Sequence, residues 1–196
     1  MADNAQKLAN PAPLGLVAFG LTTILLSLIN AGVLPKTGES VVIPLAMAYG
    51  GTVQILVGLL EFRAANTFGM TAFLSYGAFW WWFALLLILG GNRVISLEGA
   101  GSTIGVALIL WGVLTTYLWI STFRLSRALW WIFLTLWIAF YLLGFGTLLG
   151  MAGLTLAGGW VGIVCGSLAM YTSFALVTNA TFGRDVLPVG AKPMLS

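Results

Sequence analysis

Hydrophobic residues fill six long stretches of this chain, and the polar residues gather in the connections between them. The stretches are Leu14–Leu34, Val41–Leu60, Met70–Leu89, Thr103–Phe123, Ala128–Leu149 and Ala157–Val177. All charged residues, eight basic and five acidic, lie outside these stretches. A helix rises about 1.5 Å per residue, so each stretch is long enough to cross the roughly 30 Å of bilayer hydrocarbon. The pattern predicts an all-α polytopic membrane protein with six transmembrane helices in one chain.

The connections between the stretches are short, so the chain has room for one transmembrane domain and two terminal segments. We expect an N-terminal segment 1–13, a six-helix transmembrane domain 14–177 and a C-terminal tail 178–196. An even number of crossings places both ends on one side, together with the connections after the second and fourth helices. That side holds Lys7, Arg63, Arg124, Arg127, Arg184 and Lys192, against Lys36 and Arg93 on the other. The positive-inside rule therefore predicts cytoplasmic termini in a multi-pass protein of the plasma membrane.

The composition excludes several classes of function. Hydrophobic residues make up 60% of the chain and charged residues 7%, and no connection is long enough for a soluble domain. A transport ATPase module or a nucleic-acid-binding domain has no place in such a chain. It has no histidine and a single cysteine, Cys165, which removes the usual haem ligand and most zinc sites. We expect no metal, no cofactor, no nucleic-acid partner and no enzymatic activity, since no nucleophile–base pair is present.

Hydroxyls and amides supply the polar content of the six stretches, with Thr22, Gln54 and Thr135 among them. Such a lining suits a small solute that is neutral or carries one charge, and it suits poorly a metal cation that needs carboxylates. For a single threonine, the competing interpretation is a hydrogen bond to a carbonyl of its own helix. For Gln54, the alternatives are an interhelical hydrogen bond and a donor that faces a passage.

Glu61 follows Gln54 by about two helical turns, so the two side chains share roughly one face of the second helix. One interpretation makes Glu61 a solvated residue at the helix end, close to Arg63. The other makes it a proton carrier whose charge state gates the access of an anionic solute. Both interpretations remain open from the sequence.

A row of glycines marks one face of the sixth helix, at Gly158, Gly162 and Gly166. Small residues let helix backbones approach closely in lipid, where burial of apolar surface no longer drives association. The row therefore predicts either helix packing inside one chain or an interface between subunits.

The motif at the start of the first helix is specific. Asn10-Pro11-Ala12-Pro13-Leu14-Gly15-Leu16 resembles the signature of the acetate uptake transporter family, the group of the succinate–acetate permeases. Further matches occur along nearly the whole chain, at Tyr49-Gly50-Gly51, Gln54, Gly58, Glu61, Asn66-Thr67-Phe68-Gly69, Ser75-Tyr76-Gly77 and Phe182-Gly183-Arg184-Asp185. One position departs from relatives that carry His-Asn at the end of the first helix, because this chain has Ile29-Asn30 there.

The resemblance implies a six-helix protomer that assembles as a homo-hexamer in the lipid bilayer, with an acetate path through each subunit. It also implies a Phe–Leu–Tyr constriction, which by position maps onto Phe19, Tyr76 and Leu136. Three helices that run in the same direction carry these residues, and at about 1.5 Å per residue their depths agree within roughly 5 Å. We expect the pathway on either side to include Asn10, Thr22, Gln54, Glu61, Asn66 and Thr135.

Three mechanisms remain open from the residues. A channel-like route for acetate and similar monocarboxylates fits best, because no Lys, Arg or His lies within the spans to hold an anion permanently. Proton-coupled symport of acetate or succinate is close behind. A channel for neutral molecules such as urea would use the same hydroxyl and aromatic lining. A scaffold without transport activity is the remaining class, and the short connections leave it little surface for docking.

Overall fold

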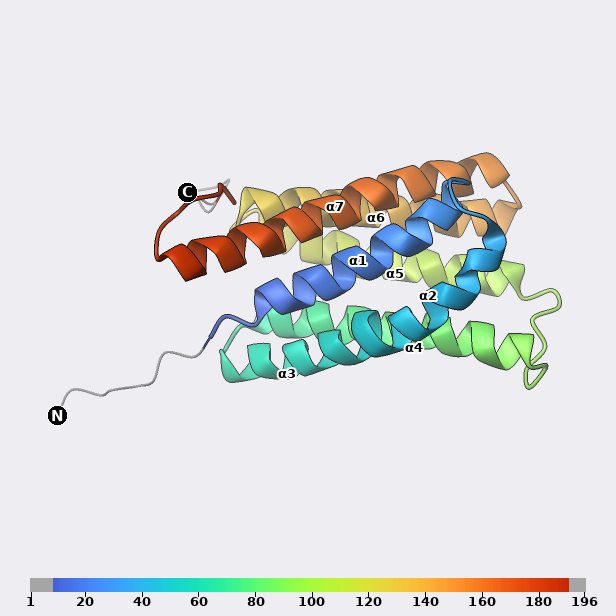
Figure 1. Ribbon diagram of the computed structural model, residues 1–196. Coiled ribbons are helices and arrows are strands. Elements are labelled where there is room, and N and C mark those ends of the chain that lie inside the picture. The colour runs from blue at the N-terminus through green and yellow to red at the C-terminus, as the bar shows by residue number, and fades with distance from the viewer. Residues whose placement is uncertain (1–8, 191–196) are drawn as a thin grey trace.

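The computed structural model describes residues 9–190, and within this range the chain is a bundle of long helices (Figure 1). In chain order the elements are α1 (Ala12–Asn30), a short 3-10 turn η1 (Lys36–Gly38), α2 (Glu39–Leu45), a π-helical segment η2 (Ala46–Val53), α3 (Gln54–Arg63), α4 (Thr67–Gly91), α5 (Gly101–Thr122), α6 (Arg127–Leu149) and α7 (Ala152–Phe182). The elements from η1 to α3 join into one long helix, Lys36–Arg63, so six helices of the described range are long and apolar enough to cross a membrane. The predicted six-helix fold is confirmed.

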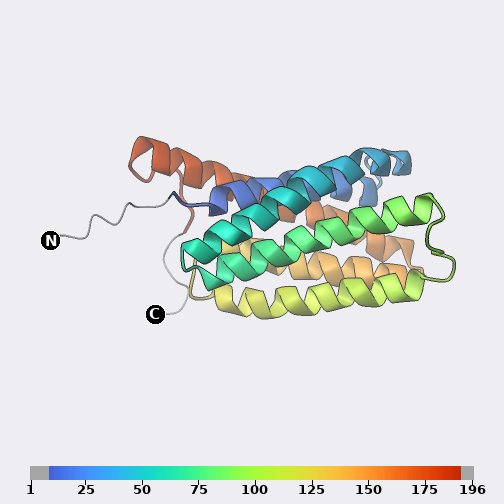
Figure 2. The ribbon, with the colours of Figure 1, turned by 90° about the horizontal axis from the view of Figure 1, so that it is seen from below.

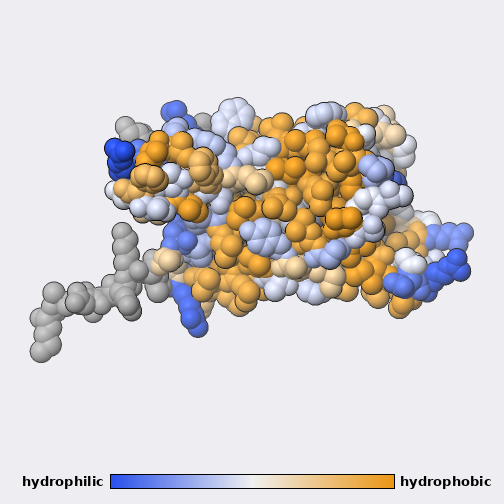
Figure 3. All heavy atoms as spheres, in the orientation of Figure 1, coloured by the Kyte–Doolittle hydropathy of each residue, from blue (hydrophilic) through white to orange (hydrophobic). Residues whose placement is uncertain are grey.

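Both described ends of the chain, Ala9 and Gly190, lie at the same end of the bundle (Figures 1 and 2). This is the geometry that an even number of crossings requires. The predicted segment 1–13 and tail 178–196 extend beyond the described range, and their residues Lys7 and Lys192 fall outside it. Hydrophobic side chains cover most of the face shown in Figure 3, and hydrophilic ones gather at its two ends.

Local backbone chemistry sets the helix ends, which differ from the hydropathy boundaries. The first hydrophobic stretch runs to Leu34, yet α1 ends at Asn30. Gly32 adopts a φ of 71°, in the left-handed region, and the amides of Val33 and Leu34 donate to the carbonyl of Leu28. This C-terminal cap closes the helix while apolar residues continue. At the other end of the chain, α7 continues to Phe182, beyond the hydrophobic stretch that ends at Val177.

The second crossing helix is irregular in its middle. Pro44 lies inside α2, and the π-helical turns of η2 follow directly. Proline removes one donor from the helical ladder, and local π-helical turns are one way in which a transmembrane helix satisfies the freed backbone groups. The hydroxyl of Thr52 donates to the carbonyl of Met47, five residues earlier, as the wider turn allows. The register of α3, which carries Gln54 and Glu61, therefore depends on this segment.

Glycines bring the helices together in pairs. A Cβ added at Gly20 would lie 2.7 Å from the carbonyl oxygen of Gly166, and one added at Gly166 would lie 2.8 Å from that of Gly20. The same reciprocal contact joins Gly105 of α5 to Gly144 of α6. Backbone therefore touches backbone between α1 and α7 and between α5 and α6, where larger residues would force the helices apart.

The glycine row on α7 contacts helices of its own chain. A Cβ at Gly162 would meet the hydroxyl of Ser27 in α1, and a Cβ at Gly158 would meet the side chain of Leu143 in α6. Of the two interpretations of this row, packing within one chain is confirmed.

Candidate solute pathway

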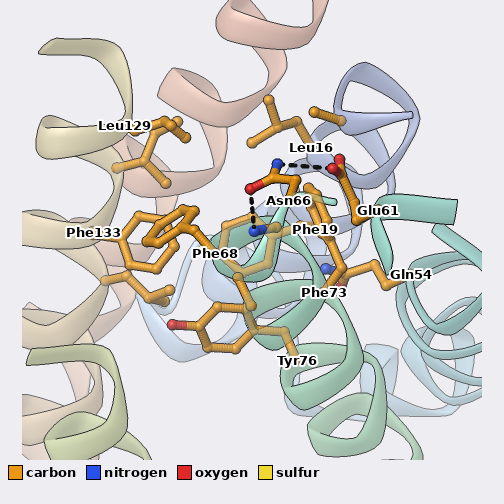
Figure 4. A pocket seen from close by; sticks show the side chains of 15 residues that line it. Leu16, Phe19, Gln54, Glu61, Asn66, Phe68, Phe73, Tyr76, Leu129 and Phe133 are labelled. Atoms are coloured by element: carbon orange, nitrogen blue, oxygen red, sulfur yellow. Dashed lines mark hydrogen bonds between the residues drawn. The ribbon is translucent and has the colours of Figure 1, made fainter. Parts of the chain in front are cut away.

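An inner cavity opens near the end of the bundle at which the described chain begins and ends. Its volume is about 70 Å³, which is room for several water molecules. Helices α1, α3, α4 and α6 surround it (Figure 4). Most of its wall is apolar or aromatic, with Leu16, Phe68, Phe73, Leu129, Ile132 and Phe133 among the lining residues.

One wall of the inner cavity is polar, and Asn66 organises it. The Oδ1 of Asn66 accepts the amide N–H of Gly69 at 3.1 Å, which caps the start of α4. Its Nδ2 donates to Oε2 of Glu61 at 2.8 Å (Figure 4). A single amide thus begins one helix and orients the carboxyl group that ends another. Glu61 is buried, at 1% exposure, and is not the solvated end residue that one interpretation expected.

Unpaired polar atoms face this cavity. Gln54 is fully buried and lines the cavity, as does Glu61. Within the described chain, neither polar atom of the Gln54 amide has a hydrogen-bond partner, and Oε1 of Glu61 has none. A buried polar atom without a partner is costly, so these groups favour water or a polar solute beside them.

An outer cavity of about 50 Å³ lies on the opposite side of Phe19 and Tyr76. Its polar lining consists of Thr23, Ser27, Asn30 and Trp80, in addition to Tyr76. The hydroxyl of Thr23 and the indole N–H of Trp80 are buried and have no hydrogen-bond partner among residues 9–190. Both groups can donate to an oxygen atom, and neither carries a charge.

The two cavities share three lining residues, and these are Phe19, Tyr76 and Leu136. The three come from α1, α4 and α6, the first, third and fifth crossing helices, and all are buried. The ring centroids of Phe19 and Tyr76 lie 5.8 Å apart, and those of Phe133 and Tyr76 lie 6.1 Å apart. Two partly polar chambers are therefore separated by a short apolar layer.

Three residues expected in the pathway line neither cavity. The hydroxyl of Thr22 donates to the carbonyl of Ala18, and that of Thr135 donates to carbonyls of its own helix at Trp131 and Ile132. Asn10 lies at the start of α1, beside a surface groove towards α7, and its side chain accepts the amide N–H of Ala12. Gln54, Glu61 and Asn66 do line the inner cavity.

The polar residues of the outer cavity were not among the residues expected in the pathway. Thr23, Ser27 and Asn30 follow one another at intervals of four and three residues, which is the spacing of one helical face. That periodicity is a signal in the sequence, and Trp80 has no comparable signal. Its two neighbouring tryptophans, Trp81 and Trp82, are more exposed and do not line the outer cavity.

The fold and the site together define a multi-pass membrane protein with two internal cavities that an apolar layer separates. The chain belongs to the GPR1/FUN34/yaaH family, whose model matches residues 1–189. The resemblance drawn from the motifs of the sequence is thereby confirmed.

Characterised relatives and a solved structure resemble nearly the whole chain. The succinate-acetate/proton symporter SatP of Escherichia coli is 43% identical over 184 residues, which cover 94% of this chain and 96% of that protein. Acetate permease A of Emericella nidulans is 38% identical, over 96% of this chain and 68% of that protein. The solved structure of the bacterial acetate channel SatP superposes with a TM-score of 0.90 at 42% identity, covering 94% of this chain and all of that one.

Proposed function

We propose that this protein lets acetate and similar small monocarboxylates cross the cytoplasmic membrane by a channel-like route. The observation that carries the proposal is the pair of cavities that have Phe19, Tyr76 and Leu136 in common. The names of the relatives, two acetate transporters and an acetate channel, support the choice of solute. In this route the solute moves from one chamber to the other through the apolar layer.

The lining suits a small anion that binds weakly. Among the described residues that line the two cavities, Glu61 is the sole residue with a formal charge, and no lysine or arginine is present to hold a carboxylate. Neutral donors such as the Gln54 amide, the Thr23 hydroxyl and the Trp80 indole can replace part of the lost hydration. Weak binding on both sides of a short apolar barrier permits fast exit, whereas a buried cation would trap the anion.

The apolar layer supplies the selectivity in this proposal. A carboxylate that passes between Phe19, Tyr76 and Leu136 loses water without gaining a hydrogen bond, and this cost grows with the length of the layer. The layer is a single ring of side chains, so a two- or three-carbon acid can span it. A longer or doubly charged acid carries more polar surface through the same gap.

The proposed orientation in the membrane follows from the positions of the basic residues. Four arginines lie at or just beyond helix ends at the end of the bundle that holds the inner cavity: Arg63, Arg124, Arg127 and Arg184. We assign this end to the cytoplasm. We further propose a homo-hexamer, as the family resemblance implies. Large apolar side chains exposed on α5, such as Leu110 and Val113, suit contact with lipid or with another subunit.

Proton symport is the second candidate, and the position of Glu61 favours it. Its carboxyl group lines the inner cavity, with one oxygen bonded to Asn66 and the other without a partner. A carboxyl group placed in this way can accept a proton from the inner chamber and can repel an anion when ionised. In that case the proton and the carboxylate would cross together.

Flux measurements on the purified protein in liposomes test both candidates. A channel equilibrates labelled acetate quickly and does not accumulate it, with or without a pH gradient. A symporter accumulates acetate when a gradient is imposed and loses the accumulated acetate when the gradient is collapsed. Acetate flux no higher than that of empty vesicles, together with flux of urea, would refute the proposal in favour of a neutral-solute channel.

A further inference from the structure

A hydrogen bond outside the two cavities fixes the hydroxyl of Tyr76. Its oxygen lies 3.0 Å from Oγ1 of Thr115, a fully buried residue of α5. Thr115 uses its own hydrogen to donate to the carbonyl of Trp111 at 2.7 Å. A threonine hydroxyl has one hydrogen to give, so Tyr76 must be the donor and Thr115 the acceptor.

This bond turns the phenol oxygen away from the polar wall of the inner cavity. Figure 4 shows the Tyr76 hydroxyl pointing away from Glu61 and Gln54. Helix α5 contributes no residue to the lining of either cavity, so Thr115 lies behind the constriction and not in it. The pathway therefore meets the ring of Tyr76, while the polar tip of the side chain is held elsewhere.

We infer that Thr115 is a positioning residue that keeps the constriction apolar, and so determines which carboxylates pass. The inference deepens the proposed function and rests on it. Without an acceptor on α5, the buried O–H of Tyr76 would lack a partner, which is unfavourable. Both chambers that Tyr76 lines contain buried polar atoms without a partner, such as Oε1 of Glu61 and the hydroxyl oxygen of Thr23, which can accept its hydrogen. A hydroxyl turned towards them would place a polar group in the narrowest part of the passage.

The chain offers a closely matched control next to this residue. Thr116 also donates to a carbonyl of its own helix, that of Gly112 at 2.8 Å, and it pairs with the hydroxyl of Tyr141 at 3.3 Å. Neither Thr116 nor Tyr141 lines a cavity. Thr115→Val and Thr116→Val therefore remove the same hydroxyl group from neighbouring positions of one helix. Only the hydroxyl of Thr115 is bonded to a residue of the constriction.

The experiment compares the flux of lactate with that of propionate in liposomes, because the two acids differ by one hydroxyl group. Net hydrogen-bond energies in proteins predict that Thr115→Val raises the lactate-to-propionate ratio by about two- to tenfold. Thr115→Ser, which retains the acceptor, should keep the ratio of the unmodified protein, and so should Thr116→Val. An unchanged ratio in Thr115→Val, or an equal rise in Thr116→Val, would overturn the inference.

A second background separates positioning from a general loosening of α5. In Tyr76→Phe there is no hydroxyl to hold, so adding Thr115→Val should leave the ratio at the value of Tyr76→Phe alone. The same rise in both backgrounds would show that Thr115 acts independently of Tyr76, against the inference. Absence of any carboxylate flux through the unmodified protein would instead refute the proposed function.

Discussion

Truncation of Phe19 is the most informative perturbation of the constriction. The centroid of its ring lies 5.8 Å from that of Tyr76, and the layer that they form separates cavities of about 70 and 50 Å³. Phe19→Ala removes one wall of this layer and joins the two chambers. A carboxylate could then keep a water molecule beside it throughout its passage.

The size of the effect follows from that retained water. A hydrogen bond to a charged group contributes about 1.5–3 kcal/mol. Each 1.4 kcal/mol or so removed from a barrier is worth about a factor of ten in rate. We therefore expect Phe19→Ala to raise acetate flux by about ten- to a hundredfold, since the apolar layer is the largest barrier in the proposed route.

Stopped-flow measurement of acetate flux in liposomes, at a matched ratio of protein to lipid, provides the assay. Phe123→Ala is the control, because this phenyl ring packs on Trp119 at 5.1 Å and lines neither cavity. The control should show the flux of the unmodified protein. If Phe19→Ala inserts normally and its flux is unchanged or lower, the assignment of the constriction is wrong.

Three further predictions concern the inner chamber and the helix contacts. Glu61→Gln should flatten the pH dependence of acetate flux, because it removes the charged group that lines the inner cavity. A profile identical to that of the unmodified protein would contradict this. Asn66→Ala should lower the melting temperature, because it removes both the cap of α4 and the hydrogen bond to Glu61. Asn66→Ser can still cap α4, so its melting temperature should lie between those of Asn66→Ala and the unmodified protein. Gly166→Val should separate α1 from α7 and reduce the yield of folded protein in detergent, since its Cβ alone would lie 2.8 Å from the carbonyl oxygen of Gly20; Gly101→Ala, with no neighbour within 4 Å, should not.

The number and type of the crossing helices were predictable because membrane insertion depends on hydropathy over about 20 residues. Their ends were not, because individual residues set them. Gly32 closes α1 while the apolar run continues, and Asn66 caps the start of α4. The π-helical turns of η2 follow directly after the helix that contains Pro44, and they leave no periodic signal in the hydrophobic pattern.

The candidate site, too, was predictable only in part from the sequence. Depth along a helix follows from residue number, and the three residues assigned to the constriction lie in one layer of the structure. Rotation about the helix axis does not follow from residue number in a helix that is apolar on every side. Thr22 and Thr135 are sequence neighbours of residues that line the cavities, and their depth in the membrane is similar. Their hydroxyls nevertheless bond to carbonyls of their own helices.

Chemical labelling at Leu136 tests most directly whether solute crosses between the two cavities of one chain. Leu136→Cys is made in a Cys165→Ser background, where serine can keep the hydrogen bond that the buried thiol donates to the carbonyl of Ile132. A small thiol reagent should then label residue 136, acetate in excess should slow the labelling, and labelled protein should lose acetate flux. Labelling of Leu110→Cys, on the exposed side of α5, should leave the flux intact. Complete labelling at residue 136 with undiminished acetate flux would contradict the account.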